Sequence, residues 1–336
     1  MELYLDSANL KEIEEGFKLG FLAGLTTTPT FMHRDGITDI DGMILKLAKM
    51  VPVLQVEALG HTAEEILDEA ERLLALGLDI KKTVFKIPIS LEGARACKML
   101  KDKGMMVNLH LVYTVQQAYV ALSAGADYVC PLVGRLQDQG HDALGVIDQC
   151  VNAVNKYGYK SKIMFSSVRY PEHVRNGLNL GVHTITVPWG VLQQLTKNNF
   201  TEIGTQQFFE HTKLMTVKVR EVISNNTGTI LANKTVMDAL VEMTRTKFGA
   251  VTIVDDNNAV KGVFTDGDLR RLLESEGEAI LGKTLGSLPF GKSPITVDAN
   301  ELLFESSKIF KEHKVDTIVV TDGGRPIGIL DIQDLI

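Results

Sequence analysis

Several features that mark particular classes of protein are missing from this sequence. It has only three cysteines, which form neither a CxxC pair nor a disulfide framework. Its net charge is −7, so no basic field argues for nucleic-acid binding. No apolar run approaches the ~20 residues of a membrane span, and the opening stretch, MELYLDSANL, lacks the basic and apolar segments of a signal peptide. We therefore expect a cytoplasmic protein with reduced thiols that binds neither nucleic acid nor membranes.

The composition is otherwise that of an ordinary globular protein. Of the 336 residues, 45% are hydrophobic and 23% are charged, which is sufficient for a sizeable core. A chain of this length is long enough for two domains.

Residues 1–200 alternate short apolar runs with longer amphipathic stretches. The amphipathic stretches include 61–77 and 91–104, which end at glycines as helices often do. The expected strands are 3–8, 24–29, 52–58, 83–89, 106–113, 128–134, 162–168 and 184–189. Eight strands, each followed by a helix, predict a parallel sheet closed into a small (β/α)8 TIM barrel, which we expect to cover 1–222. A doubly wound open sheet is the main alternative, and it is disfavoured because no glycine-rich phosphate-binding fingerprint follows any strand.

Polar or charged residues stand at most of the expected strand ends. In a barrel of this kind, catalytic groups lie at the C-terminal ends of the strands. Polar residues are also common where a strand ends and the chain reaches solvent. For any single residue, this is the better explanation. Asp6, Glu57 and Lys86 fit it less well, because they lie inside otherwise apolar runs. The candidate site residues are Asp6, Thr27, Thr28, Glu57, Lys86, Asn108, His110, Arg135, Ser167 and Arg169.

Lys86 interrupts an apolar run, TVFKIPIS (83–90), that is typical of a buried strand. Lysine is rarely buried unless something pairs with it. Either Lys86 meets a carboxylate or reaches water at the strand end, or its surroundings favour a neutral amine that attacks a carbonyl. This stretch alone leaves both interpretations open.

The chain changes character after the expected barrel. The pattern over 203–225 predicts a long helix that closes the first domain, and the polar stretch SNNTG (224–228) predicts a linker. We expect residues 223–336 to form a second, smaller α+β domain.

The second domain contains an internal repeat. GAVTIVDDNNAVKGVFTDGDL (249–269) parallels DTIVVTDGGRPIGILDIQDL (316–335) at one constant offset, and each copy follows a helical pattern. One such unit could not bury its apolar face alone, so two are expected to pack face to face. The helical patterns cover 235–247 and 301–313, and the two units are expected at about 228–275 and 290–336.

The first domain resembles the transaldolase and fructose-6-phosphate aldolase family. The matching stretches are MELYLDSANL, GLTTTPT, LQVEAL, VFKIPIS, VNLHLVYT, YVCPLVGRLQD and FSSVR. The resemblance implies that Lys86 forms a Schiff base, that Asp6 exchanges a proton with the sugar hydroxyl, and that Glu57 moves protons through a bound water. The other substrate-binding positions that it implies are Thr27, Thr28, Asn108, Arg135, Ser167 and Arg169, the last three for a phosphate group.

Two positions depart from the family pattern. The family has T-T-N-P, with an asparagine that contacts the bound three-carbon unit, and Thr28 stands there in this chain. A family threonine that holds the catalytic water is replaced by His110, which the strand period places on the same face as Asn108. A histidine on a strand is often a satisfied structural residue, but at this position we expect His110 to share proton transfer with Glu57 or to contact the substrate.

The second domain resembles a tandem pair of CBS domains. In such pairs a glycine, a Ser/Thr and an aspartate hold the ribose and phosphate of a nucleotide, and the first copy has Gly262, Thr265 and Asp268 at these positions. The second copy keeps Asp334, but Asp331 replaces the hydroxyl residue and would repel a phosphate. The resemblance therefore implies one competent site, for an adenine or cytidine nucleotide.

These resemblances lead to three functional hypotheses. The first is a transaldolase-like enzyme that transfers a dihydroxyacetone unit from a sugar phosphate, needs no cofactor beyond its lysine and is regulated by a nucleotide. By analogy, the fusion points to surface-sugar biosynthesis. The second is an aldolase-type lyase, although its relatives have glutamine at the position of Glu57; the third is an inactive sensor of sugar phosphates, for which Lys86 would not be required. A homo-oligomer is expected, because both types of domain commonly assemble.

Overall fold

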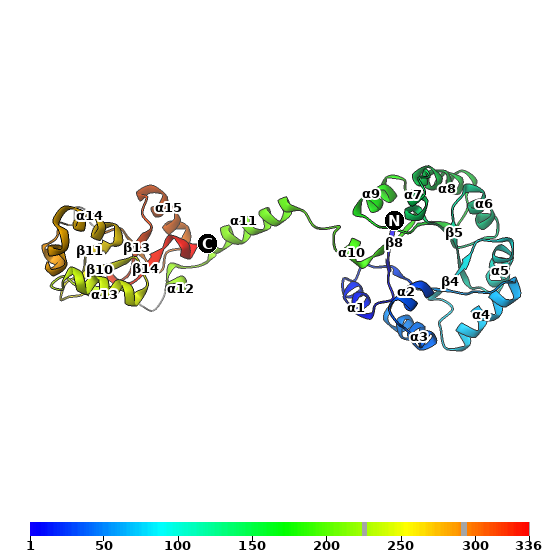
Figure 1. The fold of residues 1–336 in the computed structure, drawn as a ribbon, viewed down its shortest axis with the longest axis horizontal. Coiled ribbons are helices and arrows are strands. Elements are labelled where there is room, and N and C mark those ends of the chain that lie inside the picture. Colours follow the sequence, from blue (N-terminus) through cyan, green and yellow to red (C-terminus); the bar gives the residue numbers. More distant parts are fainter. Residues whose placement is uncertain (224–226, 290–293, 336) are drawn as a thin grey trace. The chain divides into compact units, whose positions relative to one another are not determined.

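The computed structural model describes residues 1–223, 227–289 and 294–335 (Figure 1). The chain divides into two compact units, Met1–Lys197 and Asn198–Ile336. Among the residues described, no helix is both long enough and apolar enough to cross a membrane.

The first unit is a closed barrel of eight parallel strands. Each strand pairs with the next in sequence, and β8 pairs with β1 to close the sheet. All eight expected strands are present, and the closed sheet confirms the predicted TIM barrel over the doubly wound alternative. The strands are β1 (Glu2–Asp6), β2 (Gly24–Thr26), β3 (Leu54–Glu57), β4 (Thr83–Pro88), β5 (Met106–Val112), β6 (Tyr128–Pro131), β7 (Lys162–Phe165) and β8 (Thr184–Pro188).

Helices follow the strands and surround the barrel, as Figure 1 shows. Their ends carry the expected signals. Thr62 and Glu65 form a capping box at the start of one helix, and Gly77 and Gly104 follow two helices with positive φ angles of 117° and 80°. The helices are α1 (Leu10–Lys18), α2 (Pro29–Arg34), α3 (Ile40–Met50), α4 (Ala63–Ala75), α5 (Leu91–Asp102), α6 (Val115–Ser123), α7 (Val133–Asp138), α8 (Ala143–Tyr157), α9 (Pro171–Asn179) and α10 (Trp189–Leu192).

The alternation of side chains along each strand divides the residues between two environments. On β4, Phe85 and Ile87 are fully buried in the apolar layer shared with the helices. Lys86, between them, projects to the opposite side and therefore into the barrel. Val84 also lies in the separate cluster that fills the barrel interior. Phe85 and Ile87, on either side of Lys86, thus belong to the outer face of the strand, and Lys86 belongs with Val84 to the inner face.

The region after the barrel differs from the sequence prediction. One helix was expected over 203–225 as the end of the first domain. The structure instead has α11 (Asn199–Thr216), an extended residue at Val217 and a short α12 (Val219–Val222). Leu214 and Val219 pack into the apolar cluster of the second repeat. These helices therefore belong to the second unit, and the boundary expected after residue 222 lies after Lys197.

The second unit contains two three-stranded sheets of the same topology, which confirms the internal repeat. In each sheet the first strand runs parallel to the second, and the third runs antiparallel to the second. Part of the predicted linker, 224–226, lies outside the described residues. The first repeat has β9 (Thr229–Leu231), α13 (Val236–Thr246), β10 (Ala250–Val254), β11 (Val260–Thr265), α14 (Asp266–Glu276) and the 3-10 turns η1 (Gly277–Gly282) and η2 (Leu285–Ser287); the second has β12 (Thr296–Asp298), α15 (Leu303–His313), β13 (Thr317–Asp322), β14 (Arg325–Asp331) and η3 (Ile332–Leu335).

Each repeat has its own apolar cluster, and the repeats also touch. Phe264 is fully buried in the first cluster, and Phe310 is buried in the second. Strand β10 of the first repeat lies against β14 of the second. This contact agrees with the expectation that the repeats pack against each other.

Candidate active site

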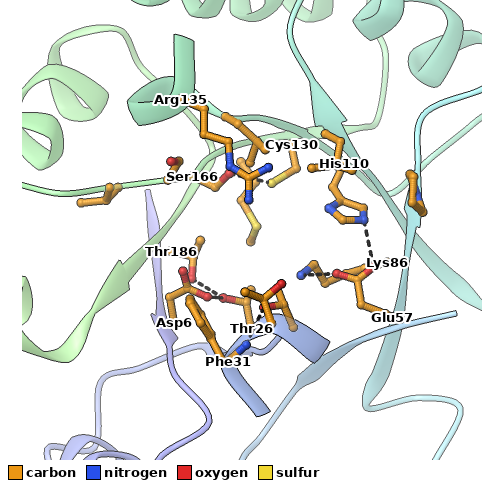
Figure 2. Close-up of a pocket in the computed structure, with 18 of the residues that line it drawn as sticks. Asp6, Thr26, Phe31, Glu57, Lys86, His110, Cys130, Arg135, Ser166 and Thr186 are labelled. Atoms are coloured by element: carbon orange, nitrogen blue, oxygen red, sulfur yellow. Dashed lines mark hydrogen bonds and ion pairs between the residues drawn. The ribbon is translucent and has the colours of Figure 1, made fainter. Parts of the chain in front are cut away.

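A pocket of about 610 Å³ opens at the C-terminal ends of the barrel strands (Figure 2). Closure of the barrel brings these ends together, so residues that are far apart in the sequence meet there. All eight strands, or the residues directly after them, contribute side chains. The residues labelled in Figure 2 are Asp6, Thr26, Phe31, Glu57, Lys86, His110, Cys130, Arg135, Ser166 and Thr186.

Lys86 is a nearly buried cation in this pocket, with 6% of its side chain exposed. Its Nζ lies 2.9 Å from Glu57 Oε1 and donates a hydrogen bond to the Thr27 carbonyl oxygen at 3.0 Å. Lys86 and Glu57 are register partners on β4 and β3, which explains their contact. The carboxylate that a structural lysine requires is therefore present. The same carboxylate can accept a proton from the amine, so the pairing is also what a nucleophilic lysine needs.

Two carboxyl groups of the pocket have pKa values displaced in opposite directions. Burial raises the pKa of Asp6, against the opposing effects of Lys86 and of Thr26, whose hydroxyl donates to Asp6 Oδ1 at 2.7 Å. Burial also acts to raise the pKa of Glu57, but the charge of Lys86 and the contact with His110 lower it overall. Carboxyl groups whose pKa values are pushed apart are suited to different proton-transfer roles.

His110 meets the Glu57 carboxylate at its other oxygen. Its Nε2 lies 2.9 Å from Glu57 Oε2. Neither atom has another hydrogen-bond partner among the described residues. Burial lowers the pKa of His110, against the opposing effect of Glu57, and so favours the neutral imidazole. The next residue, Leu111, has a φ of 56°, and the pairing of β5 with β6 shifts register there; such bulges re-aim side chains beside active sites.

Cationic and hydroxyl groups gather on another wall of the pocket. Arg135, Ser167 and Arg169 all line it. Ser167 has a left-handed φ of 59°. Arg135 Nη1 donates to the Tyr113 hydroxyl at 3.3 Å, and the Arg169 guanidinium is paired with Asp138. Two guanidinium groups and a hydroxyl can donate hydrogen bonds to a phosphate.

Two predicted residues do not line the pocket. Thr27 is buried, and its carbonyl oxygen accepts a hydrogen bond from Lys86. Asn108 is fully buried, and its Nδ2 donates to Gln55 Oε1 at 2.7 Å. The other predicted residues of the barrel line one pocket, and they are Asp6, Thr28, Glu57, Lys86, His110, Arg135, Ser167 and Arg169.

Sequence reasoning missed two threonines beside Asp6. Thr26 Oγ1 contacts both Asp6 and the Thr186 hydroxyl, which comes from β8. Neither threonine interrupts an apolar run conspicuously. The only available signal was the position of Thr26 at a strand end, directly before the TTP motif. Thr28, by contrast, lines the pocket and uses its hydroxyl to cap α2, accepting from the Phe31 N–H at 3.4 Å.

Three of the four predicted nucleotide-binding residues of the second unit lie where the third strand of a repeat ends, and they are Thr265, Asp268 and Asp334. Gly262 lies on β11. Thr265 caps α14, and the Thr265 hydroxyl donates to Asp268 Oδ2 at 2.6 Å. The backbone N–H of Thr265 also donates to Asp268 Oδ2, at 2.9 Å. The second repeat builds the same backbone contact, since the Asp331 N–H donates to Asp334 Oδ2 at 2.9 Å. The chief difference between the two turns is that the first has the hydroxyl group of Thr265 where the second has the carboxylate of Asp331.

Two family models match parts of this chain, and several known proteins are similar to it. Residues 3–249 match the family model described as transaldolase/fructose-6-phosphate aldolase, and residues 290–336 match the CBS domain model. A protein from Shouchella clausii named "probable transaldolase" is 35% identical over 209 residues, which are 62% of this chain and 95% of that protein. A protein of the same name from Desulforudis audaxviator is 37% identical over 212 residues, 62% of this chain and 96% of that one. Among solved structures, a CBS-domain-containing protein from Agrobacterium tumefaciens aligns with 35% of this chain and 90% of its own, at 22% identity and a TM-score of 0.32.

Proposed function

Because the chain belongs to the transaldolase/fructose-6-phosphate aldolase family, we propose that it is a Schiff-base enzyme acting on a ketose phosphate. It cleaves the bond between C3 and C4 and transfers the resulting dihydroxyacetone unit to an aldehyde acceptor. The observation that carries this proposal is the position of Lys86. Its Nζ is buried at the floor of a pocket and lies 2.9 Å from a carboxylate that can take its proton.

The lysine supplies the electron sink for the reaction. Neutral Lys86 adds to the C2 carbonyl, and loss of water gives an iminium that carries the positive charge. Cleavage of the C3–C4 bond then sends an electron pair toward that iminium and leaves an enamine on Lys86. Addition of the enamine to the acceptor aldehyde reverses these steps, and water finally releases the product.

The two carboxyl groups divide the proton transfers. Glu57, with its lowered pKa, is ionised beside Lys86 and takes the ammonium proton. Asp6, whose pKa is raised by burial, is suited to exchange a proton with the C4 hydroxyl as the bond breaks. Thr26 donates to Asp6 and thereby orients its carboxyl group.

Arg135, Ser167 and Arg169 are proposed to hold the phosphate of the sugar, because cationic and hydroxyl donors meet on one wall of the pocket. Glu57 favours transfer of the three-carbon unit to an acceptor over its release as free dihydroxyacetone, since the resemblance associates glutamine at this position with the lyases. A lyase is therefore the second candidate. The CBS domain is proposed to bind an adenine or cytidine nucleotide that regulates the barrel, which requires unequal binding to two conformations.

Borohydride trapping tests the proposed function directly. The protein is incubated separately with fructose 6-phosphate, sedoheptulose 7-phosphate and dihydroxyacetone, reduced, digested and examined by mass spectrometry. A reduced three-carbon adduct on the peptide that contains Lys86, absent from Lys86→Met, is the expected result. If folded protein yields no adduct with any of the three donors, the Schiff-base function is wrong for these donors, and the sensor hypothesis gains support.

A further inference from the structure

The Glu57 carboxylate bridges two nitrogen atoms, one at each oxygen. Lys86 Nζ lies 2.9 Å from Oε1, and His110 Nε2 lies 2.9 Å from Oε2. Lys86 and His110 both line the pocket, so both can reach a bound substrate. Apart from each other, His110 Nε2 and Glu57 Oε2 have no partner among the described residues. A buried imidazole whose Nε2 meets the carboxylate that also contacts Lys86 is placed to exchange a proton with that carboxylate.

We propose that His110 is a catalytic acid–base residue, which together with Glu57 stores the proton released by Lys86 and returns it to the oxygen that leaves as water. This inference rests on the Schiff-base function proposed above. His110 acts at one step of the reaction, which is the dehydration of the carbinolamine and its reversal.

The proton count of this step closes without a co-reactant. The Lys86 ammonium first gives one proton to the Glu57–His110 pair, and the neutral amine forms its bond to the C2 carbonyl carbon. A second proton moves from nitrogen to oxygen and gives the neutral carbinolamine. The stored proton is then returned from His110 to the hydroxyl oxygen, the C–O bond breaks, and water leaves as the nitrogen lone pair forms the iminium. Two protons have left the nitrogen, and both depart on the water molecule.

The charges around His110 favour this order of events. The positive charge of Lys86 lowers the pKa of His110, in addition to the larger effect of burial. When Lys86 gives up its proton, that repulsion disappears and the imidazole becomes a better acceptor. When the iminium forms, positive charge returns to the lysine nitrogen, and the imidazolium again becomes a stronger acid at the moment when it must donate.

The other groups that face His110 do not compete for this role. Its register partner on β6 is Cys130, whose thiol pKa is raised by burial to about 11, so the thiol stays protonated. Arg135 on α7 adds a fixed positive charge, which lowers the pKa of His110 further. Among the described residues, Glu57 on β3 and Lys86 on β4 are the other charged groups that act on His110.

The test compares His110→Gln with the wild type in single-turnover trapping at several pH values. Glutamine keeps a hydrogen-bond donor but cannot store a proton. We expect the rate of adduct formation to fall about 10²–10³-fold, while the donor concentration for half-saturation changes less than about threefold. The wild-type rate should decline at acid pH with an inflection below the ordinary histidine value of about 6.5, and the variant should lose that inflection.

Two further variants make the result decisive. His110→Thr, which can hold a water beside Glu57, should recover part of the rate without the inflection. His183→Gln replaces another histidine of the barrel, whose Nδ1 accepts from the Ile163 N–H at the opposite end of the strands, and it should match the wild type. A folded His110→Gln protein with wild-type rate and inflection overturns the role of His110 alone. Absence of any adduct from the wild type overturns the proposed function, and this inference with it.

Discussion

Replacing Gly134 by alanine should displace the loop that carries Ser167 and Arg169. A Cβ atom at Gly134 would lie 2.2 Å from the Ser167 carbonyl oxygen and 2.8 Å from Arg169 Nε. Ordinary contact begins at 3.4 Å, so the carbonyl must retreat by about 1 Å. Overpacking of this kind typically costs about 1–3 kcal/mol, which corresponds to a Tm about 2–10 °C lower in a domain of this size.

The same displacement should impair binding at the phosphate end of the pocket. Misplacement by 1 Å can cost roughly 10²-fold in rate, so we expect kcat/KM for a ketose phosphate to fall about 10–100-fold. Adduct formation with dihydroxyacetone, which has no phosphate, should change less than about threefold, because Lys86, Asp6 and Glu57 are not carried by this loop.

Gly190→Ala is the matched control for this substitution. Gly190 lies in helix α10, and nothing stands within 4 Å of an added Cβ there. The measurements are thermal unfolding and steady-state kinetics of both variants. If Gly134→Ala and Gly190→Ala have the same Tm and the same kcat/KM, the loop that carries Ser167 and Arg169 accommodates the added methyl group without loss of stability or activity. The prediction from this close approach is then refuted.

Two other substitutions test the electrostatics of the barrel. Asp6→Asn should abolish C–C cleavage but stabilise the protein by about 0.5–2 kcal/mol at pH 7–8, because burial raises the pKa of Asp6 and ionising it costs the native state free energy. The gain should shrink as the pH falls through that raised pKa and vanish near the ordinary value of about 3.9; urea unfolding that shows an undiminished gain down to pH 4 would contradict this reasoning. Asp127→Ala should cost about 1–3 kcal/mol, since its carboxylate accepts from the Val107 N–H at 2.8 Å and pairs with Lys101 at 2.7 Å. In the same urea assay, Asp102→Ala, which removes only an exposed pair with Lys98, should cost less than about 0.5 kcal/mol, and equal losses in the two variants would speak against a structural role for Asp127.

Much of the barrel could be predicted from local patterns alone. The period of the apolar residues is a property of a single strand or helix, so it marked all eight strands before any contact between them was known. The interruption at Lys86 was informative for the same reason. A charged residue between Phe85 and Ile87 must project to the other face of the strand, and in a barrel that face is the interior.

The depth of each residue inside the barrel was not predictable in this way. Asn108 and His110 share one face of β5 by strand period, yet His110 lines the pocket while Asn108 is buried against Gln55. The contact of Thr26 with Thr186 joins β2 to β8. These placements depend on how the strands tilt and stagger when the sheet closes, which no single segment encodes.

The sequence by itself therefore determined the strands of the barrel, their order and the residue types available for chemistry, because these depend on periodicity and composition within short segments. Only the tertiary structure decided that Glu57 touches both Lys86 and His110, and that α11 belongs with the second unit through the packing of Leu214. Contacts of this kind are made between segments that are distant along the chain. They depend on the closure of the sheet and on the apolar surface against which a helix packs. Both are properties of the folded molecule as a whole.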